Sequence, residues 1–173
     1  SNVAVQVDYV EVTAPTFDQW PPESHTRVFL ERAEDANDFG YAREMLTRFM
    51  QRAWRRPVTK VEIDQKMVLL GKLRPQCEDL QEALVEVLAT VLSSPKFLYL
   101  VKTGEKLEQE MSDFELASSL SFFLWSSTPD DELLKLAAES KLRNPEVLEA
   151  QTQRLLDDPK SQRFAKHFTR QWL

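Results

Sequence analysis

Three dipeptides in the last third of the chain pair a helix-capping residue with proline: Thr128-Pro129, Asn144-Pro145 and Asp158-Pro159. Threonine, asparagine and aspartate cap helix N-termini, and proline is tolerated at the first helical position because its missing N–H has no partner there. We therefore expect a helix to begin at each dipeptide. Because the resulting helices are short, the region should pack as a compact antiparallel array.

The rest of the chain carries similar helix signals. Thr59 with Glu62, and Ser112 with Glu115, have the spacing of a capping box, in which each side chain satisfies the other residue's backbone N–H. Apolar residues recur at helical spacing between the breaks, and only three glycines occur in 173 residues. The chain is therefore expected to be mainly α, with about six or seven helices. Four of them should span about 39–55, 59–73, 78–92 and 112–125.

The segment from Val3 to Val12 is the one strong strand signal, because valines and a tyrosine alternate along it. A lone strand cannot satisfy its own backbone groups. Its partner would be Lys96 to Val101, a neighbouring domain, or a second copy of the chain in a strand-mediated homodimer. The prolines from Ala14 to His25 then predict an extended arm that ends in a short helical turn after Pro22. The expected fold is a helical array with an N-terminal β-strand and arm, divided into residues 1–22, 23–105 and 106–173.

The uncharged stretch from Leu116 to Pro129 is shorter than the roughly 20 apolar residues that a membrane-spanning helix needs. Because it is apolar on nearly all sides, it predicts a buried helix with Phe122 to Trp125 at the centre of the array. No membrane span is expected. The final helix ends on Trp172 and Leu173 without a cap, so we expect it to continue in a longer protein.

Charge and cysteine content argue against several function classes. The formal net charge of −6 lacks the basic field of a nucleic-acid-binding protein, so no nucleic-acid partner is expected. The single cysteine, Cys77, excludes an intramolecular disulfide and any multi-cysteine metal or haem motif within this chain. His25 and His167 lack the spacing of metal ligands. We therefore expect neither a metal nor a cofactor in this chain.

A basic stretch near the end of the first long helix is the candidate site. Arg48, Arg52 and Arg55 can share one helix face, and Arg56 follows. A guanidinium fork recognises carboxylate and phosphate, so these four residues predict a surface that binds an anion or a partner. The alternative is structural, because cations complement a helix C-terminus and arginine stems cover apolar surface.

The acidic cluster from Asp130 to Glu132 has two interpretations. In the first turn of a helix, these side chains compensate the helix dipole. In the other, Arg55, Arg56 and these acids line part of a cleft in an enzyme fragment, hydrolytic or oxidative, that acts on polysaccharide. Convergence of the arginines and acids on one pocket from different helices would favour the enzyme.

Several longer phrases resemble one protein family: "RAWRRPVT" (52–59), "LATVLSSPKFLYLV" (88–101), "LASSLSFFLWSSTPDDELLKLA" (116–137) and "FTRQWL" (168–173). They are similar to large planctomycete proteins that are built from consecutive domains of unknown function and often fused to a c-type cytochrome module. "DYVEVTAP" and "DQWPPESH" resemble the junction that follows a β-sandwich in these proteins.

The resemblance implies an exported protein, located in the periplasm or at the cell surface. It also implies that Val3 to Val12 is the last strand of a preceding β domain. The C-x-x-C-H haem motif is absent from this chain, so redox chemistry would lie elsewhere in the parent protein. The leading hypothesis is a non-catalytic docking or scaffolding module whose partners are the neighbouring domains.

Overall fold

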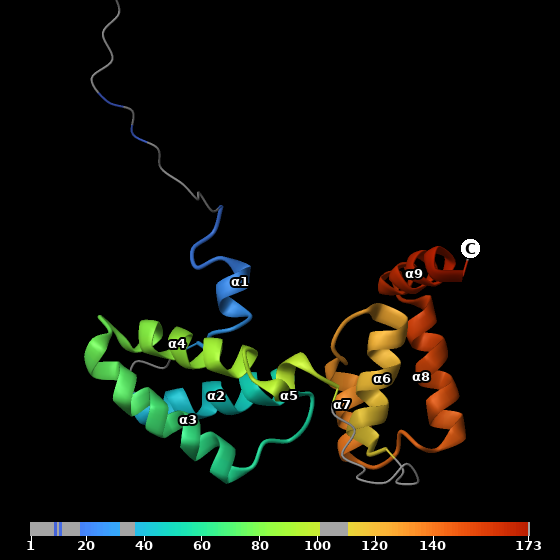
Figure 1. Ribbon diagram of the computed structural model, residues 1–173, viewed down its shortest axis with the longest axis horizontal. Coiled ribbons are helices and arrows are strands. Elements are labelled where there is room, and N and C mark those ends of the chain that lie inside the picture. The colour runs from blue at the N-terminus through green and yellow to red at the C-terminus, as the bar shows by residue number, and fades with distance from the viewer. Residues whose placement is uncertain (1–8, 10, 12–17, 32–36, 101–110, 173) are drawn as a thin grey trace, which may run out of the picture. The chain divides into compact units, whose positions relative to one another are not determined.

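The computed structural model describes residues 9, 11, 18–31, 37–100 and 111–172 (Figure 1). The chain divides into two compact units, residues 1–34 and 35–173, and each is described by itself. The described part of the first unit contains α1 (Glu23–Thr26), a single turn that begins after Pro22 as expected. Within it, the ring of His25 stacks on that of Phe29 with centroids 4.8 Å apart.

The first half of the second unit is a group of three long helices. Each of α2, α3 and α4 contacts the other two (Figure 1). Its elements are α2 (Asp38–Trp54), α3 (Lys60–Leu73), the 3₁₀ turn η1 (Arg74–Gln76), α4 (Leu80–Leu92) and α5 (Pro95–Leu98). Their apolar stripes meet in a core that includes Ala42, Met45, Leu46, Met50, Ile63, Met67, Leu70, Leu84, Val87 and Val91.

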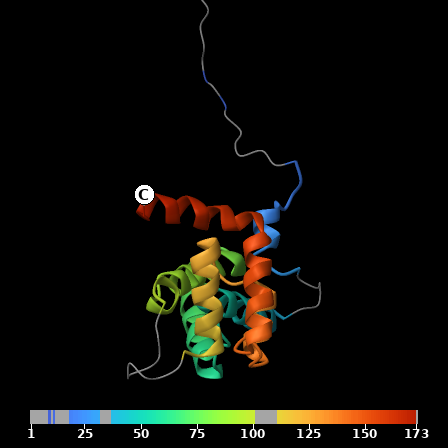
Figure 2. The same ribbon diagram turned by 90° about the vertical axis from the view of Figure 1, so that its right-hand side faces the viewer.

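The second half of this unit is built around α6 (Asp113–Trp125), which contacts α7, α8 and α9. In Figure 2, α6 and α8 run side by side and α9 crosses their end. The remaining elements are α7 (Asp131–Ala138), α8 (Pro145–Asp157), the 3₁₀ turn η2 (Pro159–Ser161) and α9 (Gln162–Trp172).

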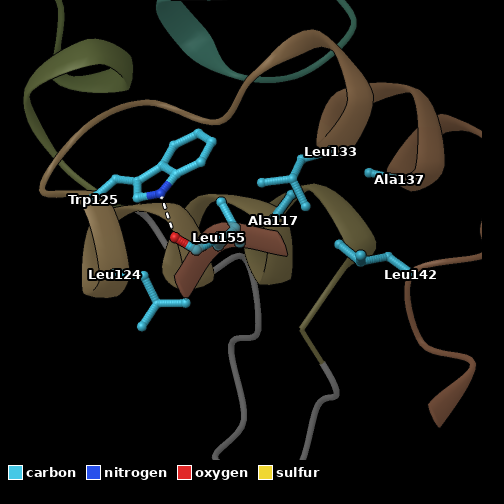
Figure 3. Packing of buried hydrophobic residues seen from close by; sticks show 7 residues of the cluster. All are labelled: Ala117, Leu124, Trp125, Leu133, Ala137, Leu142 and Leu155. Atoms are coloured by element: carbon cyan, nitrogen blue, oxygen red, sulfur yellow. Dashed lines mark hydrogen bonds between the residues drawn. The ribbon is translucent and has the colours of Figure 1, made fainter. Parts of the chain in front are cut away.

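Trp125 is the largest side chain in the core of this second half, and only 1% of it is exposed (Figure 3). Its indole Nε1 donates a hydrogen bond of 2.9 Å to the backbone oxygen of Leu155, which satisfies the one polar atom of the ring. The side chains clustered with it are Ala117, Leu124, Leu133, Ala137, Leu142 and Leu155. The indole therefore ties the end of α6 to α8.

Most of the predicted helix starts are confirmed. Both capping boxes are present, at Thr59 and at Ser112. Asn144 caps α8 with Pro145 at the first position, and Asp158 caps η2, which leads into α9. The predicted start at Thr128-Pro129 is wrong, because Asp130 caps α7 two residues later by accepting a hydrogen bond from the backbone N–H of Leu133.

The predicted fold class is right in being mainly α and wrong in its N-terminal β-strand. Within the described residues every regular element is a helix or a 3₁₀ turn. Tyr9 and Glu11 have no regular secondary structure, and the rest of Val3 to Val12 lies outside the described residues. The suggested partner segment also differs, because Pro95–Leu98 forms α5 and Leu100 is not in a strand. The strand-mediated homodimer rested on this strand and is not pursued.

Two further expectations need correction. The described residues form nine α-helices, not six or seven, partly because α1 and α5 are single turns too short to show a periodic pattern. Phe123 is 60% exposed, although Leu124 and Trp125 are buried as predicted. Apolar residues lie on every face of α6, but not every face is buried. The neighbouring helices α7, α8 and α9 leave one face of α6 open. The division at residues 22/23 and 105/106 stays a prediction.

No helix within the described residues is long and apolar enough to cross a membrane.

Candidate functional site

Arg55 ends α2 in a left-handed backbone conformation, with φ of 57°. This turn takes its side chain out of the helical register and into the protein, where it is only 5% exposed. Its guanidinium donates to the backbone oxygens of Ala53 (3.1 Å), Lys96 (3.1 Å), Phe97 (3.2 Å) and Tyr99 (3.2 Å). Three of these oxygens belong to the end of α5, so Arg55 caps that helix from 40 residues earlier in the chain.

The Arg55 guanidinium also contacts the second half of the unit. It lies 5.5 Å from the ring centroid of Phe122 on α6, a distance typical of a cation–π contact. Burial lowers the pKa of Arg55, but an arginine remains charged at neutral pH all the same. Carbonyl dipoles and an aromatic face therefore stabilise this buried charge, and four of its five N–H donors are used by backbone oxygens.

Arg56 is also engaged within the protein. It forms a two-pronged ion pair with Glu62, with nitrogen–oxygen distances of 2.7 and 3.2 Å. Glu62 accepts further hydrogen bonds from Lys96 on α5 and from the backbone N–H of Thr59. The Trp54 ring lies beside the two cations, 5.6 Å from Arg56 and 4.7 Å from Lys96. Glu62 thus joins the end of α2, the start of α3 and α5.

These contacts strongly shift the pKa of Glu62. The hydrogen bond from Arg56 is the largest cause, and it lowers the pKa of Glu62 far below its ordinary value of 4.5 against the opposing effect of burial. The carboxylate is therefore ionised at neutral pH. A group that is permanently charged and fully hydrogen-bonded is suited to structure, not to proton transfer.

Arg48 and Arg52 differ from the other two arginines because both are exposed on α2. Within the part of the chain that the structure describes, neither has an ion-pair partner. They line a cavity of about 340 Å³ whose opposite wall is formed by α7, including Lys135 and Asp131. The structure thus brings together Arg48, Arg52 and part of Arg56, and it separates Arg55 from them.

The acidic cluster from Asp130 to Glu132 does not act as one group. Asp130 caps α7 and forms a two-pronged ion pair with Arg154 of α8, at 2.7 and 3.2 Å. Glu132 accepts a hydrogen bond of 2.8 Å from Gln151. Asp131 alone lines the cavity with the arginines. For Asp130, burial by itself would raise the pKa, but the hydrogen bonds from Arg154 and the Leu133 N–H outweigh it and lower the pKa.

A second cavity, of about 440 Å³, adjoins the first and shares Arg56, Pro57 and Phe114 with it. Its wall is more apolar and includes Trp54 and Tyr99. Both cavities lie between the two helical halves of the unit. Within the described residues, no group of three or more His, Cys, Asp or Glu side chains is arranged to hold a metal ion.

Sequence reasoning missed the residues that complete these arrangements. Lys135 enters the cavity from α7, and Phe122 meets Arg55 from α6. Neither could be placed there from local spacing, because each is more than 60 residues away from the arginines in sequence. Glu62 was identified as half of a capping box, but its ion pairs with Arg56 and Lys96 depend on tertiary packing.

Comparisons with protein families match the two helical halves separately. Residues 41–102 match the family described as "PSD5: Protein of unknown function (DUF1595)". Residues 111–173 match the family described as "PSD4: Protein of unknown function (DUF1592)". No curated protein and no solved structure matches the chain. Two adjacent domains of this kind fit a family built from consecutive domains of unknown function.

Proposed function

We propose that the chain is a non-catalytic helical module that docks against neighbouring domains of a large exported, cytochrome-associated protein. The observation that carries this proposal is a row of three phenylalanine rings along α6 and α9. Phe123 and Phe164 have centroids 4.8 Å apart, and Phe164 and Phe168 have centroids 5.3 Å apart. Phe123 is 60% exposed and Phe168 is 46% exposed. Contiguous exposed aromatic rings are typical of protein interaction surfaces.

The charge of α9 supports a partner with an acidic rim around an apolar centre. Arg163, Lys166 and Arg170 lie on this helix, and no acidic residue occurs between Gln162 and Trp172. The whole chain nevertheless carries a net charge of −6, so α9 is a local basic region on an acidic protein. Complementary charge at the rim of an interface favours encounter and orientation more than affinity. The apolar row would then supply most of the affinity.

The origin and location in this proposal rest on sequence resemblance. The phrases shared with planctomycete proteins favour a parent protein that is exported and fused to a cytochrome module. The matches to two consecutive domains of unknown function are consistent with such a parent. In this proposal the cytochrome module carries out the haem chemistry, and this chain positions that module.

The alternative of a polysaccharide-active enzyme receives little support. Acid–base hydrolysis of a glycoside requires two carboxyl groups opposed across the substrate. Asp131 is the one carboxylate among the residues lining the arginine cavity, whereas Asp130 and Glu132 pair with α8. Arg55 is buried, and four of its five N–H donors bond to backbone oxygens. We therefore do not carry the enzyme forward as a second function.

The test uses the chain together with the polypeptides that its own gene encodes on either side. Binding would be measured by sedimentation velocity for the wild type and for Phe123→Asp. We expect wild-type complex formation and at least a tenfold loss in the variant, a typical effect at the centre of an interface. The matched control is Val68→Asp on α3, because Val68 is also 60% exposed. Absence of binding to either neighbour, or an equal loss in both variants, would refute the proposal.

A further inference from the structure

We infer that the cavity between α2 and α7 binds a small organic molecule that carries a phosphate or sulfate group. This inference is independent of the docking proposal, because the cavity and the phenylalanine row share no residue. Three cationic side chains line the cavity: Arg48 and Arg52 from α2, and Lys135 from α7. Within the described residues, none of the three has an ion-pair partner, although seven other ion pairs between lysine or arginine and a carboxylate of this unit are formed.

The placement of these charges is unfavourable without a ligand. Arg48 and Arg52 are four residues apart on one helix, where like charges repel each other. Lys135 faces them across the cavity, and Arg56 adds a fourth cation at its edge, although Glu62 pairs with it. A concave site with an excess of one sign of charge, here four cations against the Asp131 carboxylate, concentrates the counter-ion it attracts. An anion between α2 and α7 would relieve the repulsion of all three cations.

The number of donors points to a tetrahedral oxyanion. A carboxylate presents its two oxygens in one plane, as in the pairing of the Arg56 fork with Glu62. Two arginines and a lysine on opposite walls, with the amide of Gln51 beside them, offer donors from several directions. A phosphate or sulfate ester has three terminal oxygens and can accept from all of them. The class of anion is therefore set by geometry as well as by charge.

The apolar part of the wall indicates that the anion is carried on an organic body. Phe114, Pro57, Leu134 and Ala138 line the same cavity as the cations. Its volume of about 340 Å³ is at the lower end of the range of small-molecule sites. An inorganic ion alone would leave this apolar wall uncovered, so the ester should bind more tightly than the free ion.

Asp131 provides a distinguishing feature, because its carboxylate lines the cavity and would repel the ligand. It is not the helix cap, since Asp130 fills that role. Removing its charge by Asp131→Asn should therefore leave α7 folded and tighten anion binding. A residue with a purely structural role would not improve binding when it is changed.

The experiment measures binding of phenyl phosphate, phenyl sulfate, benzoate, phenol and inorganic phosphate to the whole chain. Isothermal titration calorimetry at pH 7.5 and fixed ionic strength would give each dissociation constant. We expect phenyl phosphate or phenyl sulfate to bind at least tenfold more tightly than benzoate, phenol or the inorganic ion. The better of the two esters identifies the preferred group. Equal binding of benzoate, or no binding of either ester at millimolar concentration, would overturn the inference.

Variants then assign the site. Arg52→Gln and Lys135→Gln should each weaken ester binding about tenfold, as expected when a charge-assisted hydrogen bond is lost. Arg43→Gln is the matched control, because Arg43 is on the same helix but pairs with Asp64 outside the cavity. Asp131→Asn should strengthen binding. If Arg43→Gln weakened binding as much as Arg52→Gln, or if Asp131→Asn did not strengthen it, the cavity would not be the binding site. Circular dichroism of each variant verifies folding.

Discussion

Replacing Arg55 by methionine is expected to destabilise the protein strongly without affecting any surface property. The wild-type side chain is 5% exposed, and its guanidinium satisfies four backbone oxygens. Methionine has a stem of similar length and introduces neither a charge nor a donor. The substitution therefore isolates the contribution of the guanidinium to the stability of α5 and the end of α2.

The magnitude follows from opposing effects. Hydrogen bonds from a charged donor contribute about 1.5–3 kcal/mol each, so four give roughly 6–12 kcal/mol in total. Removing the buried cation recovers a desolvation cost of several kcal/mol. Lys96 and Tyr99 are exposed residues, so water can reach part of the freed backbone oxygens. We expect a net loss of about 2–4 kcal/mol, which is a large share of the 5–15 kcal/mol typical of a folded domain.

The assay is urea denaturation followed by circular dichroism at 222 nm, with the free energy of unfolding obtained by linear extrapolation. A second pair of variants separates the side chain from the backbone. Arg55→Gly should be less destabilising than Arg55→Ala by about 1 kcal/mol, because the left-handed φ of 57° is unfavourable for alanine and not for glycine. The difference in the free energy of unfolding between the two variants measures the cost of the left-handed backbone. The alanine variant includes this cost together with the loss of the guanidinium.

Arg52→Met is the matched control, since Arg52 is an exposed arginine one turn earlier in the same helix. An exposed substitution of this kind should change the free energy of unfolding by less than about 0.5 kcal/mol. If Arg55→Met unfolded at the same urea concentration as the wild type, the guanidinium would not be holding α5, and the structural account of Arg55 would be wrong.

Three further substitutions test other contacts. Glu62→Gln should lower the free energy of unfolding by about 2 kcal/mol at pH 7. Because folding lowers the pKa of Glu62, the contribution of its charge to stability is complete above about pH 5 and is lost as the pH falls further. The melting temperature, measured between pH 7 and pH 3, should therefore depend less on pH in the variant than in the wild type. Trp125→Phe removes the donor to the Leu155 oxygen and leaves a small cavity, which should destabilise the protein by about 2–3 kcal/mol in urea denaturation. Ser126→Gly should raise the melting temperature, with a gain of about 1 kcal/mol, because Ser126 ends α6 at a left-handed φ of 51°. A wild-type acid dependence in Glu62→Gln would contradict the first expectation, and a wild-type urea midpoint in Trp125→Phe the second. A lowered melting temperature in Ser126→Gly would contradict the third.

The helix starts could be predicted from sequence where the cap depends on neighbouring residues alone. Thr59 with Glu62, Ser112 with Glu115, and Asn144 before proline each satisfy their own backbone groups within three residues. Thr128 failed because Asp130 is a competing cap two residues later. The ion pair of Asp130 with Arg154, 24 residues away, favours the later start, and no local pattern contains that information.

The candidate site was predicted only in part, for a geometric reason. The shared face of Arg48, Arg52 and Arg55 assumes that all three residues are helical. Arg48 and Arg52 satisfy that assumption, but the chain leaves the helix at Arg55 with positive φ, and the side chain turns inward. Positive φ is uncommon for arginine, so the sequence gives little warning of it. The backbone oxygens that favour it belong to residues more than 40 positions later.

The suggestion that Lys96 to Val101 pairs as a strand is wrong for its described part, Lys96 to Leu100, for a related reason. Aromatic and branched residues favour strands in general, but that preference depends strongly on context. Here Pro95 is at the start of a helical turn, and Arg55 accounts for the backbone oxygens at its end. A tertiary contact thus overrides a local preference in a segment of only four residues.

The capping of α5 by Arg55 also bears on how such proteins can be rearranged by gene fusion. In the stretch that matches a family, residues 41–102, Arg55 at the end of α2 bonds to the last helical turn, α5. Donor and acceptors both belong to this stretch. A segment closed on itself in this way can be joined to a new neighbour without losing the hydrogen bonds to the oxygens of Lys96, Phe97 and Tyr99. The contact between the Arg55 guanidinium and the Phe122 ring is the part of this arrangement that a new neighbour would have to replace.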